Sequence, residues 1–449
     1  MRSRMSTCSV LSIVFMVMVG TAVSYAAARV TPPGKSHALD PNASLSDYLV
    51  FAVFNNPGLE AVFDRWKAGL ERIPQARSLP DPRFSYRYFI REVETRVGPQ
   101  RQAFELSQMM PWFGKLDLAG NVAAQAAQAD YHAYEGAKRS LFLEVKNAYY
   151  DLYFLGRSLA VTREHVNLLI HLDEVVRARY RAAAASQPDM IKVQVELGKL
   201  EDRLKTLRDL AGPTKARLNA ALNRPVTALL EIPMDISLPE RALSEEALFD
   251  RLDRTHPKLL ALSATAHRHR LATDLAKKAY RPDLTVGLSY VEIGKAPFGA
   301  TPADSGQDVV SAAVSLNIPL WHKRLSARVR EHRLRQLSAQ QERQDLTNRL
   351  HARLKLDLSH LRDAQRKRNL YGDTLLPKAQ EALTATEAAF RNSSGSFLEL
   401  IDAQRVTLEF QLAHARAGAD HGRSLAAVEF MVGELSGPHG ISATSPDPY

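Results

Sequence analysis

Apolar residues in the stretch between Pro111 and Pro188 follow the period of a helix. No proline interrupts this stretch, and its apolar positions recur in steps of four and three. The seam consists of Leu141, Val145, Ala148, Leu152, Leu155, Leu159, Val166, Leu169, Val176 and Tyr180. A period near 3.5 predicts a long helix that packs in coiled-coil fashion. About 70 residues at a rise of 1.5 Å would span roughly 100 Å, which is longer than a globular core requires.

Two short stretches before this helix alternate with period two. In residues 84–91 and 103–110, apolar or aromatic side chains alternate with polar or small ones, and a polar loop with Gly98 separates the stretches. Such alternation with a short polar loop predicts a β-hairpin over residues 83–110. One face of this hairpin is expected to be apolar and the other polar or small.

The second half of the chain repeats the plan of the first. Pro282-Asp283 corresponds to Pro80-Asp81 at an offset of 202 residues, and Pro319 corresponds to Pro111 at an offset of 208. A second alternating hairpin precedes a second long helical pattern. Each half therefore reads helix, β-hairpin, long helix, turn, helix, and the fold class is mainly α with two β-hairpins.

The expected organisation follows by residue number. A signal peptide covers 1–28, a disordered lead 29–43, a linker 224–243 and a disordered tail 434–449. The first repeat, 44–223, holds a helix, the hairpin 83–110, the long helix 113–181 and the helix 189–222. The second repeat, 244–433, holds a helix, the hairpin 284–318, the long helix 322–390 with a kink at Pro377, and the helix 397–432.

The N-terminal residues have the pattern of an export signal. Arg2 and Arg4 precede an apolar run over residues 10–23, and Ala26 to Ala28 provide a small-residue cleavage site. The one cysteine, Cys8, lies before the apolar run, so the mature chain is expected to lack cysteine. That excludes a catalytic thiol and cysteine-ligated metal.

Composition offers no site for chemistry. The formal charge of +10 could indicate a nucleic-acid partner, but no compact basic motif with interleaved aromatic residues accompanies it, so a solvated helical surface is the better interpretation. His267 and His269 are two residues apart and would lie on different faces of a helix, which disfavours a shared metal site. No nucleophile–base spacing or phosphate-binding glycine loop is present. We therefore expect no enzyme activity, no cofactor and no metal site.

Four strands of about nine residues have the length that crosses a membrane when tilted. Four strands alone cannot close a barrel, and open edges are not tolerated in lipid. Either the hairpins belong to an ordinary soluble sheet, or several chains contribute strands to one barrel. The first alternative describes a soluble periplasmic coiled-coil scaffold or adaptor, and the second a membrane channel.

Several motifs, taken in order, resemble the TolC family of outer-membrane efflux proteins. They are Ser107-Gln108, Pro111 to Lys115, Leu375 to Ala379 and Ser396 to Gln404, together with the duplicated plan. The resemblance covers roughly residues 44–433. The motif around Trp112 resembles that of the heavy-metal efflux members of the family. The resemblance implies a homotrimer with a twelve-stranded outer-membrane β-barrel and a coiled-coil tunnel across the periplasm. It also implies a periplasmic adaptor and an inner-membrane pump, most simply of the RND type, as partners.

The resemblance further implies two kinds of site. Acidic residues after the second turn would form rings at the channel constriction, and Glu399, Asp402 and the repeat equivalent Asp189 match those positions. The alternative is that these are solvated carboxylates near helix N-termini. The turns where an adaptor would dock contain Arg181, Ala184, Ala185 and Ser186, then Asn392, Ser394 and Gly395. The basic run His322 to Arg335 could meet lipid headgroups at the membrane rim or could be a solvated face.

Overall fold

The structure is a computed structural model of the 449-residue chain, and it describes residues 39, 43–183, 185–238, 244–296, 303–392 and 394–433. The expected signal peptide and tail lie outside the described residues, as do all but two residues of the expected lead. Every element described below belongs to the unit Leu39–Tyr449.

Three short helices precede the first strand, and side-chain caps mark the starts of the first two. They are α2 (Leu45–Asn55), α3 (Pro57–Leu70) and α4 (Arg72–Arg77). Ser44 and Asp47 form a capping box at the start of α2. Asn56 ends α2 and caps α3 with its side-chain oxygen, which accepts from the Leu59 N–H at 3.0 Å. The helical stretch before the first hairpin is thus divided at Asn56.

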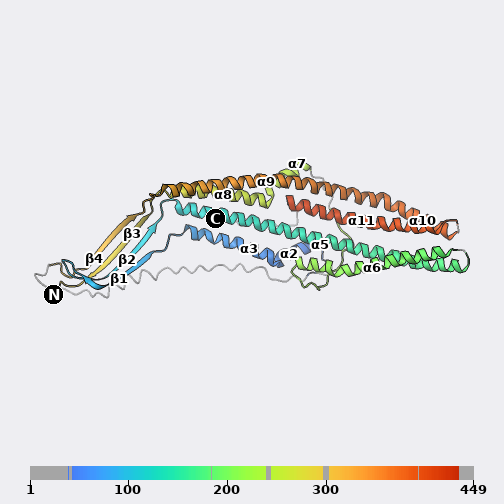
Figure 1. Ribbon diagram of the computed structural model, residues 1–449, viewed down its shortest axis with the longest axis horizontal. Coiled ribbons are helices and arrows are strands. Elements are labelled where there is room, and N and C mark those ends of the chain that lie inside the picture. The colour runs from blue at the N-terminus through green and yellow to red at the C-terminus, as the bar shows by residue number, and fades with distance from the viewer. Residues whose placement is uncertain are drawn as a thin grey trace. The chain divides into compact units, whose positions relative to one another are not determined.

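The four strands form one antiparallel sheet. They are β1 (Arg83–Val93), β2 (Gln100–Met110), β3 (Leu284–Ile293) and β4 (Val309–Leu316), in the order β1-β2-β3-β4. The hairpins of the two halves lie side by side and are joined along β2 and β3 (Figure 1). Because all neighbours are antiparallel, the connections to α4, α5, α8 and α9 leave from the same end of the sheet.

One face of the sheet is apolar across all four strands, as the alternation predicts. Its exposed side chains include Phe84, Tyr86, Tyr88, Leu106, Leu288, Val310, Val314 and Leu316. The opposite face carries small or polar residues such as Ser85, Glu105, Ser289 and Ser311. A sheet with a large exposed apolar face requires a covering surface, either protein or lipid.

The long helical pattern of the first half forms a helical hairpin of α5 (Lys115–Arg181) and α6 (Gln187–Ala221). Of the ten seam residues in α5, all but Leu159 and Tyr180 are buried. They are covered because α5 packs against α6, α8 and α11. Pro188 lies in the first turn of α6. Proline fits there because it lacks an N–H, and the N–H groups of the first turn have no acceptor within the helix.

The segment expected as a linker packs on the helices as far as the structure describes it, to residue 238. Leu230 is buried in one apolar cluster with Leu141 of α5 and Leu222. Gly156 lies so close to this segment that a Cβ added to it would come within 2.3 Å of Ile232 Cγ2. Leu222, Leu230 and Ile232 of this segment therefore pack in the core of the first half.

The second half follows the same order with one interruption. Its helices are α7 (Glu245–Thr255), α8 (Pro257–Lys278), α9 (His322–Asn369), α10 (Leu376–Arg391) and α11 (Phe397–Val432), with a π-helical turn η1 (Leu370–Leu375). The long helix predicted over 322–390 appears as one continuous helical run from His322 to Arg391, and η1 separates α9 from α10 beside the predicted kink at Pro377. Pro377 has no N–H for the carbonyl of Asp373 and its ring crowds that carbonyl, which favours a wider turn there.

Apolar clusters hold the helices of each half together. One cluster contains Leu141, Val145 and Leu152 of α5 with Tyr48 of α2, and a second contains Leu252, Leu354 and Val428 from α7, α9 and α11. Among the described residues, no helix combines the length and hydropathy needed to cross a membrane.

Candidate functional site

The turn between α5 and α6, which we call the first tip turn (residues 182–186), contains a left-handed residue and ends at the N-cap of α6. Arg181 is the last residue of α5, and Ala183 adopts a left-handed conformation with φ of 58°. Ser186 caps α6 through its hydroxyl and is followed by Pro188. Ala185 packs against the apolar cluster at this end, and Ala184 lies outside the described residues.

The turn between α10 and α11, the second tip turn (residues 392–396), has a different conformation. The backbone N–H groups of Ser394 and Gly395 both donate to the Ala389 carbonyl, at 2.9 and 3.1 Å. A Cβ on Gly395 would lie 2.8 Å from that of Ala389, so this tight turn requires glycine. Asn392 follows Arg391, the last residue of α10.

The two tip turns lie at the same end of the molecule (Figure 1), and the helix ends beside them are in contact. Arg179 of α5 donates to the Arg391 carbonyl at 2.9 Å, and its guanidinium carbon lies 4.3 Å from the centroid of the Phe390 ring. A shared apolar cluster lies beneath them, made of Leu169, Leu172, Val176, Val193, Phe390, Phe397, Leu400 and Ile401. The two helical hairpins are thus joined at their tips.

Two of the three predicted constriction carboxylates are capping residues. Asp189 accepts from the Ser186 N–H at 3.2 Å, and Glu399 accepts from the Ser396 N–H at 3.0 Å, each completing a capping box. The two boxes occupy equivalent places in the two repeats. The structure therefore gives both carboxylates a local stabilising role at a helix N-terminus, which is compatible with a position facing a channel.

Asp402 belongs to a different set of contacts. It lies one turn after Glu399 on α11 and forms an ion pair with Arg405 at 3.4 Å. Arg405 also pairs with Glu196 of α6 and so joins α11 to α6. Hydrogen bonds from Arg405 and then Lys199 hold the pKa of the Glu196 carboxyl below its usual range. Sequence reasoning missed both Glu196 and Arg405, because they are far apart along the chain.

At the opposite end, Asp283 organises the junction between strands and helices. Its carboxylate accepts from the Trp112 N–H at 2.7 Å and pairs with Lys115 at 2.6 Å. Both charged side chains are less than a fifth exposed. The Lys115 ammonium also donates to the Arg281 carbonyl at 3.1 Å. The Pro-Asp motif and the Pro-Trp-Phe-Gly-Lys motif, which are distant in sequence, thus form one contact site where β3 and α5 begin.

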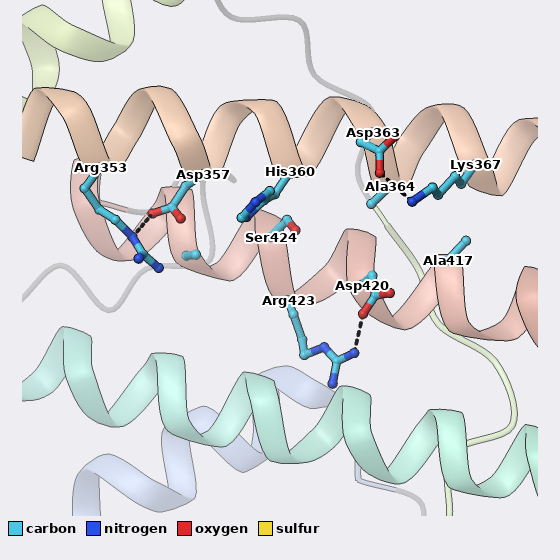
Figure 2. Close-up of a pocket in the computed structure, with 11 residues that line it drawn as sticks. Arg353, Asp357, His360, Asp363, Ala364, Lys367, Ala417, Asp420, Arg423 and Ser424 are labelled. Atoms are coloured by element: carbon cyan, nitrogen blue, oxygen red, sulfur yellow. Dashed lines mark hydrogen bonds and ion pairs between the residues drawn. The ribbon is translucent and has the colours of Figure 1, made fainter.

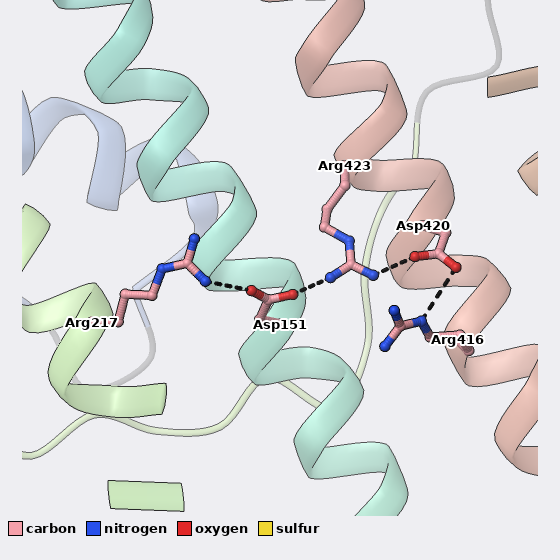
Figure 3. Close-up of polar contacts among 5 residues, drawn as sticks. All are labelled: Asp151, Arg217, Arg416, Asp420 and Arg423. Atoms are coloured by element: carbon pink, nitrogen blue, oxygen red, sulfur yellow. Dashed lines mark hydrogen bonds and ion pairs between the residues drawn. The ribbon is translucent and has the colours of Figure 1, made fainter. Parts of the chain in front are cut away.

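Charged residues also link the helices midway along them. Asp151 of α5 accepts from Arg217 of α6 at 2.9 Å and from Arg423 of α11 (Figure 3). Arg423 also pairs with Asp420, which accepts from Arg416 at 3.3 Å. All five side chains are paired, so this network connects three helices, and its three arginines and two aspartates leave one net positive charge. Asp151, a charged residue next to the seam residue Leu152 of α5, is the sequence signal that could have predicted this network.

An open pocket of about 350 Å³ lies beside this network, lined by side chains of α9 and α11 (Figure 2). Its ionic residues are Arg353, Lys367, Arg423, Asp357, Asp363 and Asp420. Three positive and three negative side chains line it, and Arg353 pairs with Asp357 while Lys367 pairs with Asp363. The pocket therefore has no net preference for an anion or a cation.

In the part of the chain that the structure describes, no three His, Cys, Asp or Glu side chains are grouped so that they could hold a metal ion. His267 and His269 do not share a site: the His269 ring instead stacks on His332 of α9, with centroids 5.8 Å apart. Burial lowers the pKa of both His269 and His332, which keeps the stacked pair neutral near pH 7.

Comparison with known proteins identifies the fold. No protein-family model matches the sequence, and no curated protein matches it. A membrane protein from Pseudomonas aeruginosa superimposes with a TM-score of 0.71 at 18% identity, over 90% of this chain and 98% of that chain. The outer membrane protein VceC from Vibrio cholerae gives 0.70 at 16% identity, over 87% and 96%. The MtrE outer membrane channel from Neisseria gonorrhoeae gives 0.68 at 15% identity, over 90% and 94%.

These matches extend over nearly the whole of each structure, and they confirm the fold that the sequence resemblance implied. The duplicated helical hairpins and the two adjoining β-hairpins are the shared plan. This chain has the fold of the outer membrane protein VceC and of the MtrE outer membrane channel.

Proposed function

We propose that the chain is the subunit of a homotrimeric outer-membrane channel whose helices extend into the periplasm. The channel passively conducts substrates that an inner-membrane pump exports through a periplasmic adaptor. The observation that carries this proposal is the sheet, which has an exposed apolar face and two open edges at β1 and β4. All its helical connections leave from one end.

Lipid on the apolar face is the covering that fits the sheet best. The strands have 8 to 11 residues, which suits a tilted membrane crossing. An open edge in lipid would leave backbone N–H and C=O groups without partners. Three copies would supply twelve strands and remove every edge, and the small or polar face would then line the pore.

Structural neighbours support the same function, because MtrE and VceC are outer-membrane proteins and MtrE is a channel. A passive conduit needs no catalytic group, and we propose neither enzyme activity nor a cofactor. The tip turns lie at the end opposite the strands, where a periplasmic adaptor and a pump, of the RND type in our proposal, would be met. The docking residues proposed are Arg181, Ala184, Ala185, Ser186, Asn392, Ser394 and Gly395.

Fractionation of the cell envelope, followed by detergent extraction and planar-bilayer recording, tests the proposal. The expected result is an outer-membrane protein that requires detergent, migrates unheated at about three times the mass of one mature chain, and forms ion-conducting pores. The competing function, a soluble periplasmic scaffold or adaptor, predicts release without detergent and no conductance. That outcome would overturn the channel proposal.

Export of a metal cation is the finer hypothesis, suggested by the motif around Trp112. Cells that lack the protein should then tolerate less copper, zinc or silver salt, and a plasmid copy should restore their tolerance. Unchanged metal tolerance together with lost tolerance to organic toxicants would assign the channel to drug efflux instead.

A further inference from the structure

The two β-hairpins have the same pairing register, so the internal repeat extends to individual residues. Phe84 of β1 pairs with Leu106 of β2. Their equivalents at offsets of 202 and 208 residues are Val286 and Val314, and these two residues pair between β3 and β4. The seam between β2 and β3 therefore shows how one hairpin of this kind meets the next.

The pairing between β2 and β3 predicts how the open edge strands β4 and β1 would pair. Each β2 residue is replaced by its repeat equivalent on β4, and each β3 residue by its equivalent on β1. In that seam Leu106 pairs with Leu288, and Phe104 pairs with Tyr290. The repeat equivalents of Leu106 and Leu288 are Val314 on β4 and Tyr86 on β1. One chain cannot join its own edges in this way, because β2 and β3 lie between them. The transposed seam thus requires β1 of a second copy.

The residues brought together by this transposition are complementary. The apolar-face pairs are Leu316 with Phe84, Val314 with Tyr86, and Ala312 with Tyr88. Phe84, Tyr88 and Leu316 are 62%, 66% and 57% exposed in the single chain, so each has surface to bury. Aromatic residues beside aliphatic ones are favourable cross-strand neighbours.

A charged pair marks the end of the same seam. Within the chain, Asp283 at the start of β3 pairs with Lys115 at the start of α5. Their repeat equivalents are Asp81, just before β1, and Lys323, in the first turn of α9. Both equivalents are exposed, and within the described residues neither side chain has an ion-pair partner.

We infer that Lys323 of each chain pairs with Asp81 of a second copy, and that this contact sets the register in which β4 joins β1 of that copy. The inference rests on the proposed trimeric channel and names the subunit contact within it. The partner is another copy of this chain, and the site lies at the membrane rim where strands continue into helices. An ion pair at this place aligns Leu316 with Phe84. It opposes a shift of β4 along β1 by two residues, which would keep every side chain on the same face of the sheet but change the cross-strand pairs.

Cysteine pairs in a Cys8→Ser background test the register, because Cys8 is the one natural cysteine. In-register variants combine Leu316→Cys with Phe84→Cys, or Ala312→Cys with Tyr88→Cys. Permuted variants use the same four substitutions in the other combination: Leu316→Cys with Tyr88→Cys, or Ala312→Cys with Phe84→Cys. A permuted pair is displaced by four residues, roughly 13 Å, which is beyond the reach of a disulfide. The in-register variants should give at least about tenfold more covalent trimer on non-reducing gels.

The outcomes separate the two proposals. Cross-linking mainly through the permuted pairs would overturn the register and leave the trimeric channel standing. A chain that stays monomeric in detergent in every variant, including the unmodified one, would overturn both.

Charge reversal tests the ion pair itself in the full-length trimer. Asp81→Lys and Lys323→Asp should each raise the rate of subunit dissociation by at least about tenfold, and the double variant should restore it. Arg324→Asp, at the neighbouring exposed basic residue, is the matched control and should change the rate little. Single variants that dissociate like the control, or a double variant without rescue, would overturn the pairing of Asp81 with Lys323.

Discussion

Arg179 of α5 lies over the ring of Phe390 of α10, with its guanidinium carbon 4.3 Å from the ring centroid. The same guanidinium donates to the Arg391 carbonyl at 2.9 Å. One side chain of the first repeat thus holds the end of a helix in the second. In the proposed channel this contact keeps the two helical hairpins of a subunit together at the narrow end.

Replacement of Arg179 by methionine is expected to loosen the tips. Methionine keeps most of the apolar contact but removes the cation–π interaction and the hydrogen bond, a loss of about 1–3 kcal/mol. We expect a larger mean single-channel conductance in planar bilayers, because the hairpins can separate more often. Arg181→Met, two residues further on at the tip, is the control. Equal conductance in the two variants would contradict a holding role for Arg179.

Removal of charge at the constriction is expected to reduce cation selectivity. Glu399→Gln suits this test because glutamine preserves the capping box with Ser396 while removing the charge. Asp402→Asn removes the second carboxylate and frees Arg405 from one partner. The double variant should shift the reversal potential in a salt gradient toward zero and weaken block by divalent cations.

A matched control for this experiment is Asp345→Asn, on α9, where the carboxylate is 65% exposed and pairs with Arg349 one turn away. It should leave the reversal potential unchanged. If the double variant behaves like this control, Glu399 and Asp402 serve the helix start and its contacts, and the constriction lies elsewhere.

Local patterns predicted most of the fold. The 3.5-residue period predicted α5, and period two predicted the strands with their apolar face, because both patterns report which side of an element is covered. The Ser-x-x-Asp and Ser-x-x-Glu capping boxes at Ser186 and Ser396 were also present in the sequence. Their contacts span three residues, so a local interpretation of Asp189 and Glu399 was possible from the start.

Contacts between distant helices could not be predicted in the same way. The ion pair between Glu196 and Arg405 depends on how α6 and α11 lie against each other. The spacing of apolar residues in each helix does not determine this relative position. The π-helical turn before Pro377 likewise depends on how the freed carbonyl is accommodated. The junction of Asp283 with Lys115 was recognised only as two separate motifs, because β2 and β3 bring them together.

Acid is expected to destabilise the helical part through His256. This residue caps α8 without a side-chain hydrogen bond and is 2% exposed. Burial, then Arg139 and Lys258, lowers its pKa to about 4. The folded state therefore binds fewer protons than the unfolded state, so stability is complete above about pH 6.5 and declines as the pH falls toward 4. The loss amounts to about 3 kcal/mol at the acidic end.

Denaturation midpoints at pH 7.5 and pH 4.5 provide the measurement. His256→Asn places at this position the residue found at its repeat equivalent, Asn56, which caps α3. This variant should show a smaller drop in midpoint between the two pH values than the unmodified chain. His171→Asn, at an exposed histidine of α5, should leave the drop unchanged. Equal drops in all three proteins would mean that other groups determine the acid sensitivity.

The close approach of α11 to α5 is expected to depend on Gly422. A Cβ added there would lie 2.4 to 2.7 Å from three atoms of the Tyr150 ring, which is buried and cannot move aside. Gly422→Ala should therefore lower the free energy of unfolding by about 1–3 kcal/mol through overpacking. Gly198→Ala in α6 is the opposite case, because nothing lies within 4 Å of its added Cβ, and it should stabilise the chain by about 0.5–1 kcal/mol. Thermal unfolding of both variants in the same detergent measures the contrast, and a Gly422→Ala protein as stable as Gly198→Ala would show that α5 and α11 are not packed this closely.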